Sequence, residues 1–81
     1  MKRPEDIANE ERKLSQLAAA IRTRRNALGI SQEALADAAS VNRTHIGEVE
    51  RGKRNVSFLL LIRIADALDL KLSELLSAAR L

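Results

Sequence analysis

The chain has no cysteine, a single aromatic residue (Phe58), one proline and three glycines among its 81 residues. Without cysteine it can form neither a disulfide nor a thiolate metal site, and it suits the cytoplasm. The shortage of helix breakers and of aromatic residues, which favour strands, predicts an all-α protein. The lack of aromatic stacking platforms also argues against binding of single-stranded RNA.

Long apolar runs are also missing. The longest covers five residues, as in Phe58 to Ile62, whereas a membrane-spanning helix needs about 20. The N-terminal sequence MKRPEDIANEERK contains no apolar segment of the kind found in secretory signals. We therefore expect no membrane partner.

The charge balance leans only slightly to one sign. Fourteen Lys and Arg residues against eleven Asp and Glu give a net charge of +3, which permits a polyanionic partner without requiring one. The chain has one histidine, no glycine-rich phosphate loop and no paired carboxylates at a plausible site. We expect no enzyme activity, no metal, no cofactor and no small-molecule ligand.

What the chain does contain is apolar residues at helical spacing, within a total apolar content of 46%. The breaks fall at Gly29 and Gly52, which suit helix ends, and at the N-capping residues Ser31, Asn42 and Ser57. One compact domain over residues 13–81 is expected, because so short a chain can build only one modest core. The predicted helices are 13–28, 32–39, 43–51, 58–68 and 72–79.

Residues 1–12 form a charged extension of balanced sign. Pro4 followed by Glu5 and Asp6 is typical of a first helical turn, and Ile7 is the only large apolar side chain. Two interpretations stay open for this segment, a frayed helical extension or an arm.

The most informative stretch is Gln32–Asn55, which predicts two short helices joined by a tight turn. Its second helix opens with Asn42-Arg43-Thr44-His45. This is the layout of a helix-turn-helix, whose second helix enters the DNA major groove with its N-terminal side chains on base edges.

A family resemblance supports this interpretation. The segments IRTRRNALGISQEALA, VNRTHIGEVERGKRN, SFLLLIRIADAL and LSELL, between Ile21 and Leu76, resemble the lambda-repressor-like (Xre-type) helix-turn-helix family. RTHIGEVERGKRNVS is also similar to the controller proteins of restriction–modification systems. The resemblance implies a five-helix fold, DNA-binding transcriptional regulation, and an ion pair between Arg25 and Glu50. The family usually has glycine in the turn where this chain has Ser40, at a cost of about 1 kcal/mol.

The recognition helix and its surroundings supply the candidate DNA contacts. Arg43 can bind guanine through two hydrogen bonds, Thr44 can contact a base edge or a thymine methyl, and Glu48 can accept from cytosine. The simpler interpretation of each is a solvated or capping side chain. The full set of expected base contacts is Asn42, Arg43, Thr44 and Glu48. The expected phosphate contacts are Gln32, His45, Arg51, Lys53, Arg54 and Asn55.

The last two predicted helices carry more apolar residues than a small domain can bury. If Phe58, Leu61, Ile64, Ala65 and Leu68 form the inner face, other leucines remain on the surface, where such patches mark interfaces. We predict a two-fold dimer that sets two recognition helices ~34 Å apart on a palindromic site, against the alternative of a monomer with a looser core. The predicted interface residues are Leu59, Leu60, Ile62, Leu72, Leu75 and Leu76.

The function expected is a cytoplasmic, nucleoid-associated prokaryotic regulator that binds double-stranded DNA as a homodimer. Its control would be by concentration, at its own promoter among others, as activator or repressor according to where the site lies relative to RNA polymerase. Two alternatives remain: the antitoxin of a toxin–antitoxin pair, and a protein-interaction module that does not bind DNA. Genomic neighbours would distinguish a controller from an antitoxin.

Overall fold

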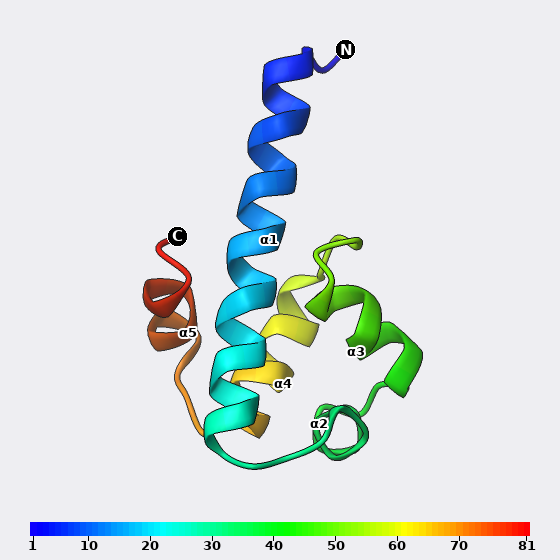
Figure 1. The fold of residues 1–81 in the computed structure, drawn as a ribbon, viewed down its shortest axis with the longest axis vertical. Coiled ribbons are helices and arrows are strands. Elements are labelled where there is room, and N and C mark those ends of the chain that lie inside the picture. Colours follow the sequence, from blue (N-terminus) through cyan, green and yellow to red (C-terminus); the bar gives the residue numbers. More distant parts are fainter.

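Five helices and no strands make up the computed structural model, which describes residues 1–81 (Figure 1). The expected all-α fold is confirmed, and the four later helices begin where the sequence predicts. The helices are α1 (Pro4–Ala27), α2 (Gln32–Ala38), α3 (Arg43–Glu50), α4 (Phe58–Ala67) and α5 (Leu72–Ala78).

Polar N-caps explain why three of these helices start where they do. The side-chain oxygens of Ser31, Asn42 and Ser57 each accept a hydrogen bond from the backbone N–H three residues later, at 3.0, 2.7 and 3.2 Å. Each bond satisfies one of the backbone donors that a helix leaves free at its N-terminus. The Asn42 cap therefore fixes where the tight turn between α2 and α3 ends and α3 begins.

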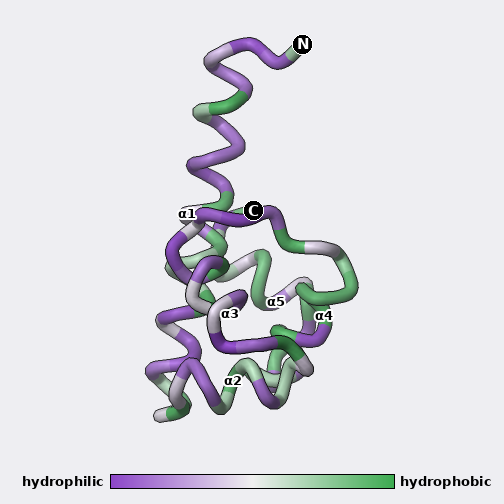
Figure 2. The backbone as a smooth tube through the Cα atoms, turned by 90° about the vertical axis from the view of Figure 1, so that its right-hand side faces the viewer, coloured by the Kyte–Doolittle hydropathy of each residue, from purple (hydrophilic) through white to green (hydrophobic).

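The charged N-terminal extension is helical and continuous with the rest of α1. Pro4 occupies the first turn, Asp6 closes a capping box with Arg3, and Lys2 pairs with Glu10 at 2.8 Å. Of the two interpretations of residues 1–12, the helical extension is confirmed. Leu14 is the first apolar residue that is partly buried, and the helix before it projects beyond the body as a mainly hydrophilic rod (Figures 1 and 2).

A single apolar core joins the five helices behind α3. Its largest fully buried apolar side chains come from every helix, and α3 packs against both α1 and α2. No helix has the length and apolar character needed to cross a bilayer. The largest fully buried apolar side chains of the core are Ile21, Leu35, Ile46, Ile64, Leu68 and Leu75.

The inward face of α4 differs from the predicted one. Leu60, expected at a dimer interface, is 3% exposed in the core, whereas Phe58, expected inside, is 66% exposed. The reason is helical phase: at about 100° per residue Leu60 lies roughly 40° from Ile64, and Phe58 lies roughly 120° away. Leu75, also assigned to the interface, is fully buried. Leu28, at the C-cap of α1, is 41% exposed.

Long polar side chains bind the carboxyl ends of the four short helices. Arg63 Nε donates to Ala39 O at 2.8 Å at the end of α2, and Arg24 Nε donates to Leu68 O at 2.9 Å at the end of α4. Arg22 Nη1 donates to the carbonyl of Glu50, the last residue of α3. Gln16 Nε2 donates to Ala79 O at the end of α5. These bonds satisfy carbonyls that have no partner within their helix.

Candidate nucleic-acid interface

Helix α3 presents a polar outer face and a buried inner one. Ile46 and Val49 pack into the core, while Arg43 and Thr44 in the first turn are exposed. His45 is partly buried. The first turn of α3 therefore keeps Arg43 and Thr44 at the surface, and their contact with bases stays a prediction.

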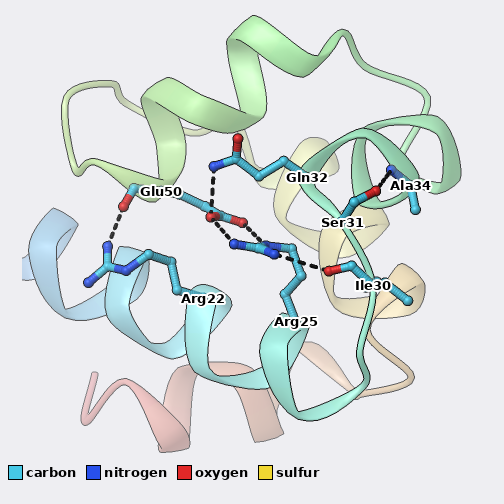
Figure 3. A network of polar contacts seen from close by, with 7 residues as sticks. All are labelled: Arg22, Arg25, Ile30, Ser31, Gln32, Ala34 and Glu50. Atoms are coloured by element: carbon cyan, nitrogen blue, oxygen red, sulfur yellow. Dashed lines mark hydrogen bonds and ion pairs between the residues drawn. The ribbon is translucent and has the colours of Figure 1, made fainter.

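A buried ion pair fixes the orientation of α3. Arg25 Nε and Nη2 of α1 donate to Glu50 Oε2 and Oε1 at 2.7 and 3.0 Å, and the Glu50 side chain is only 2% exposed (Figure 3). Gln32 Nε2, at the start of α2, donates to the same carboxylate at 3.1 Å. Arg22 donates to the Glu50 carbonyl. The start of α2 and the end of α3 are thereby tied to one point on α1.

The ion pair also affects the basicity of its arginine. The hydrogen bonds that Arg25 donates to the Glu50 carboxylate, more than the charge of Glu50 alone, raise the pKa of the Arg25 guanidinium above its ordinary value, although burial opposes this. Arg25 also donates from Nη1 to Ile30 O at 3.0 Å, and no buried side-chain nitrogen or oxygen lacks a partner. The network is complete, so it holds the two helices in one arrangement.

Polar residues of α2 and α3 line a shallow hollow at the outer surface. Its volume is about 230 Å³ and no apolar side chain lines it. Arg43 and Arg51 bring two guanidinium groups to it, and neither takes part in any of the ion pairs of the chain. The lining residues are Gln32, Arg43, Thr44, Gly47 and Arg51. This arrangement suits an anionic ligand.

The comparisons with known proteins agree with this geometry. The family model described as Helix-turn-helix (HTH_3) matches residues 21–75. Control protein C.SmaI of Serratia marcescens is 44% identical over 61 residues, covering 75% of this chain and 73% of that protein. The restriction-modification controller protein C.AhdI from Aeromonas hydrophila is 42% identical with a TM-score of 0.75, covering 76% of this chain and 94% of the other. The clp gene regulator ClgR from Corynebacterium glutamicum is 32% identical with a TM-score of 0.81, covering 84% and 72%.

The chain belongs to the helix-turn-helix family HTH_3. This is a family of DNA-binding transcription regulators and not of enzymes. The predicted family and class of function are thereby confirmed.

Within this helix-turn-helix protein the structure gathers some predicted contacts and separates others. Gln32, Arg43, Thr44 and Arg51 share the hollow. Lys53, Arg54 and Asn55 lie exposed in the loop after α3. Gly47 also lines the hollow, where it is buried beneath the Arg51 side chain.

Glu48 and Arg54 are joined in a way that the sequence did not predict. Arg54 Nη1 lies 3.2 Å from Glu48 Oε2, with the side chains 48% and 32% exposed. The pair connects the outer face of the recognition helix to the basic loop. The part of Arg22 in holding α3 was also missed, although its spacing of one helical turn from Arg25 is a usable signal.

The basic loop approaches α1 closely at Gly52. Its backbone has φ +67°, and a Cβ there would lie 3.2 Å from Ser15 Cα and 3.3 Å from Ser15 N. A side chain would meet both backbone strain and the α1 backbone, so glycine is required at this position. The close contact holds the start of the loop against α1.

Proposed function

We propose that this helix-turn-helix protein is a dimeric regulator that binds a palindromic operator and controls the genes of a restriction–modification system. The proposal rests on the exposed first turn of α3. The buried Arg25–Glu50 pair fixes the orientation of this helix, and the unpaired basic side chains of Arg43 and Arg51 lie on its outer side. The relatives that are named control or controller proteins supply the biological setting. Such a protein would act on the nucleoid in the cytoplasm, at its own promoter among others and next to RNA polymerase.

Base recognition is assigned to the first turns of α3. Arg43 is exposed and unpaired, so it can reach guanine O6 and N7, and Thr44 is exposed beside it. The Asn42 side chain already accepts a hydrogen bond from His45 N, which leaves its amide N–H groups for a base or a phosphate. Glu48 binds Arg54 through Oε2, which leaves Oε1 to accept a hydrogen bond from a cytosine.

Backbone contacts are assigned to the residues around the two helix ends. Gln32 and Arg51 border the hollow, and His45 lies partly buried on α3. Lys53 and Asn55 are exposed in the loop that follows, together with Arg54. These contacts would supply affinity that depends on salt and carries no sequence information.

The dimer is proposed to form through the apolar surface of α4. Leu59 is 65% exposed and Phe58, next to it, is 66% exposed, while Ile62 one turn later is partly buried. Figure 2 shows the tube of α4 as hydrophobic over most of its length. Leu72 and Leu76 of α5 are partly buried against the core and can contribute only their remaining surface. A two-fold axis at this surface would give the spacing of one DNA turn.

In-vitro selection from random duplex DNA at physiological salt tests the proposal. Enrichment of a two-fold symmetric sequence is the expected result, and its occurrence upstream of endonuclease and methyltransferase genes would name the target. Arg43→Ala should then cost about 1–3 kcal/mol at one base pair per half-site, whereas Arg54→Ala should weaken binding to all sequences alike. Absence of any enriched sequence would favour a protein-interaction module instead.

A further inference from the structure

Apolar residues from both ends of the chain surround a hollow beside the start of α4. Its volume is about 370 Å³, and it lies between α1, at the base of its projecting part, and the last residue of the chain. Figures 1 and 2 show the C-terminus level with the point where α1 leaves the body. The apolar residues that line this apolar hollow are Leu14, Leu17, Val56, Leu61 and Leu81.

The walls of the apolar hollow leave apolar surface in contact with solvent. Leu81 is 48% exposed, and Leu14 and Leu61 are only partly buried. Ile7 precedes Leu14 by seven residues, so it lies within roughly 20° of the same face of α1, and it is 45% exposed. The apolar face of α1 thus continues beyond the body without a partner, and the hollow beneath it is large enough for an apolar side chain.

Phe58, the only aromatic residue of the chain, lies next to the apolar hollow without filling it. Its side chain is 66% exposed and is not among those that line the hollow. Leu61, which does line it, follows Phe58 by three residues on α4 and lies roughly 60° away around the helix. A protruding apolar side chain and an apolar recess are therefore neighbours on one surface, and each lacks a partner within the chain.

A two-fold axis would give both of them a partner. In an isologous dimer the same surface of each copy meets, so a residue that contacts a second residue of the other copy is matched by the reverse contact. A protruding side chain beside a recess can therefore be exchanged between two copies. Phe58 and the neighbouring Leu59 also belong to the α4 surface proposed for the dimer, so the apolar hollow continues that surface onto α1.

We propose that Phe58 of each copy fills the apolar hollow of the other, so that α1 and the C-terminal residue join the dimer interface. The inference rests on the dimer of the proposed function and deepens it. Leu14, Leu17 and Leu81 lie outside residues 21–75, which the helix-turn-helix family model matches. The ends of this chain, rather than the family's fold, therefore build the contact. It favours pairing with a second copy over pairing with a relative whose ends differ.

Leu81→Glu distinguishes this contact from a dimer held by α4 alone, because Leu81 lies beyond α5. The new charge would be buried under the partner's ring, so the dimer Kd in sedimentation equilibrium should rise roughly tenfold or more. Phe58→Ala should raise it at least roughly 100-fold, since each dimer loses two buried rings. The matched control is Leu28→Glu, at an exposed leucine on the C-cap of α1, which should leave the Kd within error of the wild type.

Combining the two substitutions tests whether the two side chains touch. In the Phe58→Ala background, Leu81→Glu should raise the dimer Kd by less than about threefold, because the contact is already lost. Each variant should bind a single operator half-site as the wild type does, which shows that the fold and the α3 surface are intact.

Disulfide trapping locates the contact directly, since the chain has no cysteine of its own. Phe58→Cys protein is mixed with Leu81→Cys protein and mildly oxidised, and the linked peptides are identified by mass spectrometry. The main product should join position 58 of one copy to position 81 of the other, because a disulfide forms only between closely placed residues. Leu28→Cys in place of Leu81→Cys should give no such product.

Failure of this contact can be told apart from failure of the proposed function. A dimer whose Kd is unchanged by Leu81→Glu would overturn the contact and leave the α4 dimer in place. A trapped product that mainly joins position 58 to position 58 would do the same, because it would set the two rings against each other. A wild type that is monomeric at the concentrations used would instead overturn the dimer of the proposed function and this contact with it.

Discussion

At the scale of single residues, the buried Glu50 carboxylate is a position where a substitution should strongly affect stability. Glu50→Ala would leave the Arg25 guanidinium, whose side chain is 14% exposed, and the Gln32 amide without their acceptor. We expect a loss of about 3–5 kcal/mol in the free energy of unfolding, measured by urea denaturation. Glu11→Ala, at an exposed site, should change it by less than about 0.5 kcal/mol. A Glu50→Ala variant that unfolds like the wild type would rule out the structural part of this pair.

The same pair predicts how Arg25 responds to pH. Its folded-state pKa is raised, mainly by the hydrogen bonds that it donates to Glu50, so its contribution to stability is complete below the unfolded pKa and is lost only as pH rises through the folded pKa. Both values lie in the strongly alkaline range that is ordinary for arginine. Between about pH 7 and pH 9, where a lysine also keeps its charge, Arg25→Lys should therefore differ from the wild type in Tm by a constant amount. A difference that changes steeply in that window would contradict this account.

Glu48 places a negative charge on the face of α3 that is proposed to approach DNA. Its only observed partner is Arg54, at 3.2 Å, and an exposed pair of this kind contributes little to stability. Glu48→Gln should leave Tm nearly unchanged, raise affinity for random duplex several-fold and narrow the ratio of operator to random binding, because it removes repulsion and releases Arg54. Titration of both duplexes by fluorescence anisotropy at fixed salt measures the ratio. An unchanged ratio would show that Glu48 takes no part in discrimination.

At the scale of helices, the carboxyl ends of all five helices have the same backbone conformation and hydrogen-bond pattern. Each ends at a residue in the left-handed conformation, and the backbone N–H of the next residue binds a carbonyl five residues back, as in Val41 N to Ala36 O at 2.9 Å. Only two of these residues are glycines. The left-handed residues are Gly29, Ser40, Gly52, Asp69 and Arg80.

Ser40, in the turn of the helix-turn-helix, therefore offers a simple stabilising substitution. It has φ 55°, a conformation that glycine adopts without steric cost, and its side chain is exposed. Ser40→Gly should raise the free energy of unfolding by roughly 0.5–1 kcal/mol and leave operator affinity unchanged. Urea denaturation of Ser40→Gly beside Ser40→Ala checks this, because alanine lacks the benefit. Equal midpoints for the two variants would refute it.

At the scale of helices, the sequence predicts those features that depend only on residues close to one another in the chain, such as the helix starts. Ser31 and Ser57 predict helix starts, because the side chain of each accepts a hydrogen bond from the backbone N–H three residues later. The inner face of α4 could not be fixed, because several apolar residues in a row fit more than one helical phase. The arginine that caps α4, Arg24, lies far from Leu68 in sequence, and only the folded chain brings them together. The same holds for the hollow between α2 and α3.

At the scale of the whole molecule, two groups of arginines outside the ion pairs differ in their internal bonds. Arg22, Arg24 and Arg63 bind carbonyls at helix ends, and their charge serves the fold. Arg43 and Arg51 have no acidic partner and lie together on one surface. A net charge of only +3 can thus sustain a local binding surface for a polyanion, because the position of the free charges matters more than their sum.

The exposed start of α4 leads to the prediction about assembly. Leu59 is 65% exposed and makes no part of the core, so Leu59→Arg should fold with a Tm close to the wild type. If α4 forms the dimer, the buried charge should shift the protein from dimer to monomer at about tens of micromolar in sedimentation equilibrium. Affinity for the full palindrome should then fall at least roughly 100-fold, because the two half-sites are no longer bound by linked subunits.

The matched control is Leu28→Arg, since Leu28 is a second exposed leucine, 41% exposed, at the C-cap of α1. It adds the same charge and should leave both the dimer and the full-palindrome affinity intact. Binding of Leu59→Arg to a single half-site should match that of the control, because the α3 surface is unchanged. A monomeric wild type at that concentration would refute the dimer altogether. A Leu59→Arg variant that remains dimeric would instead exclude the α4 surface as its interface.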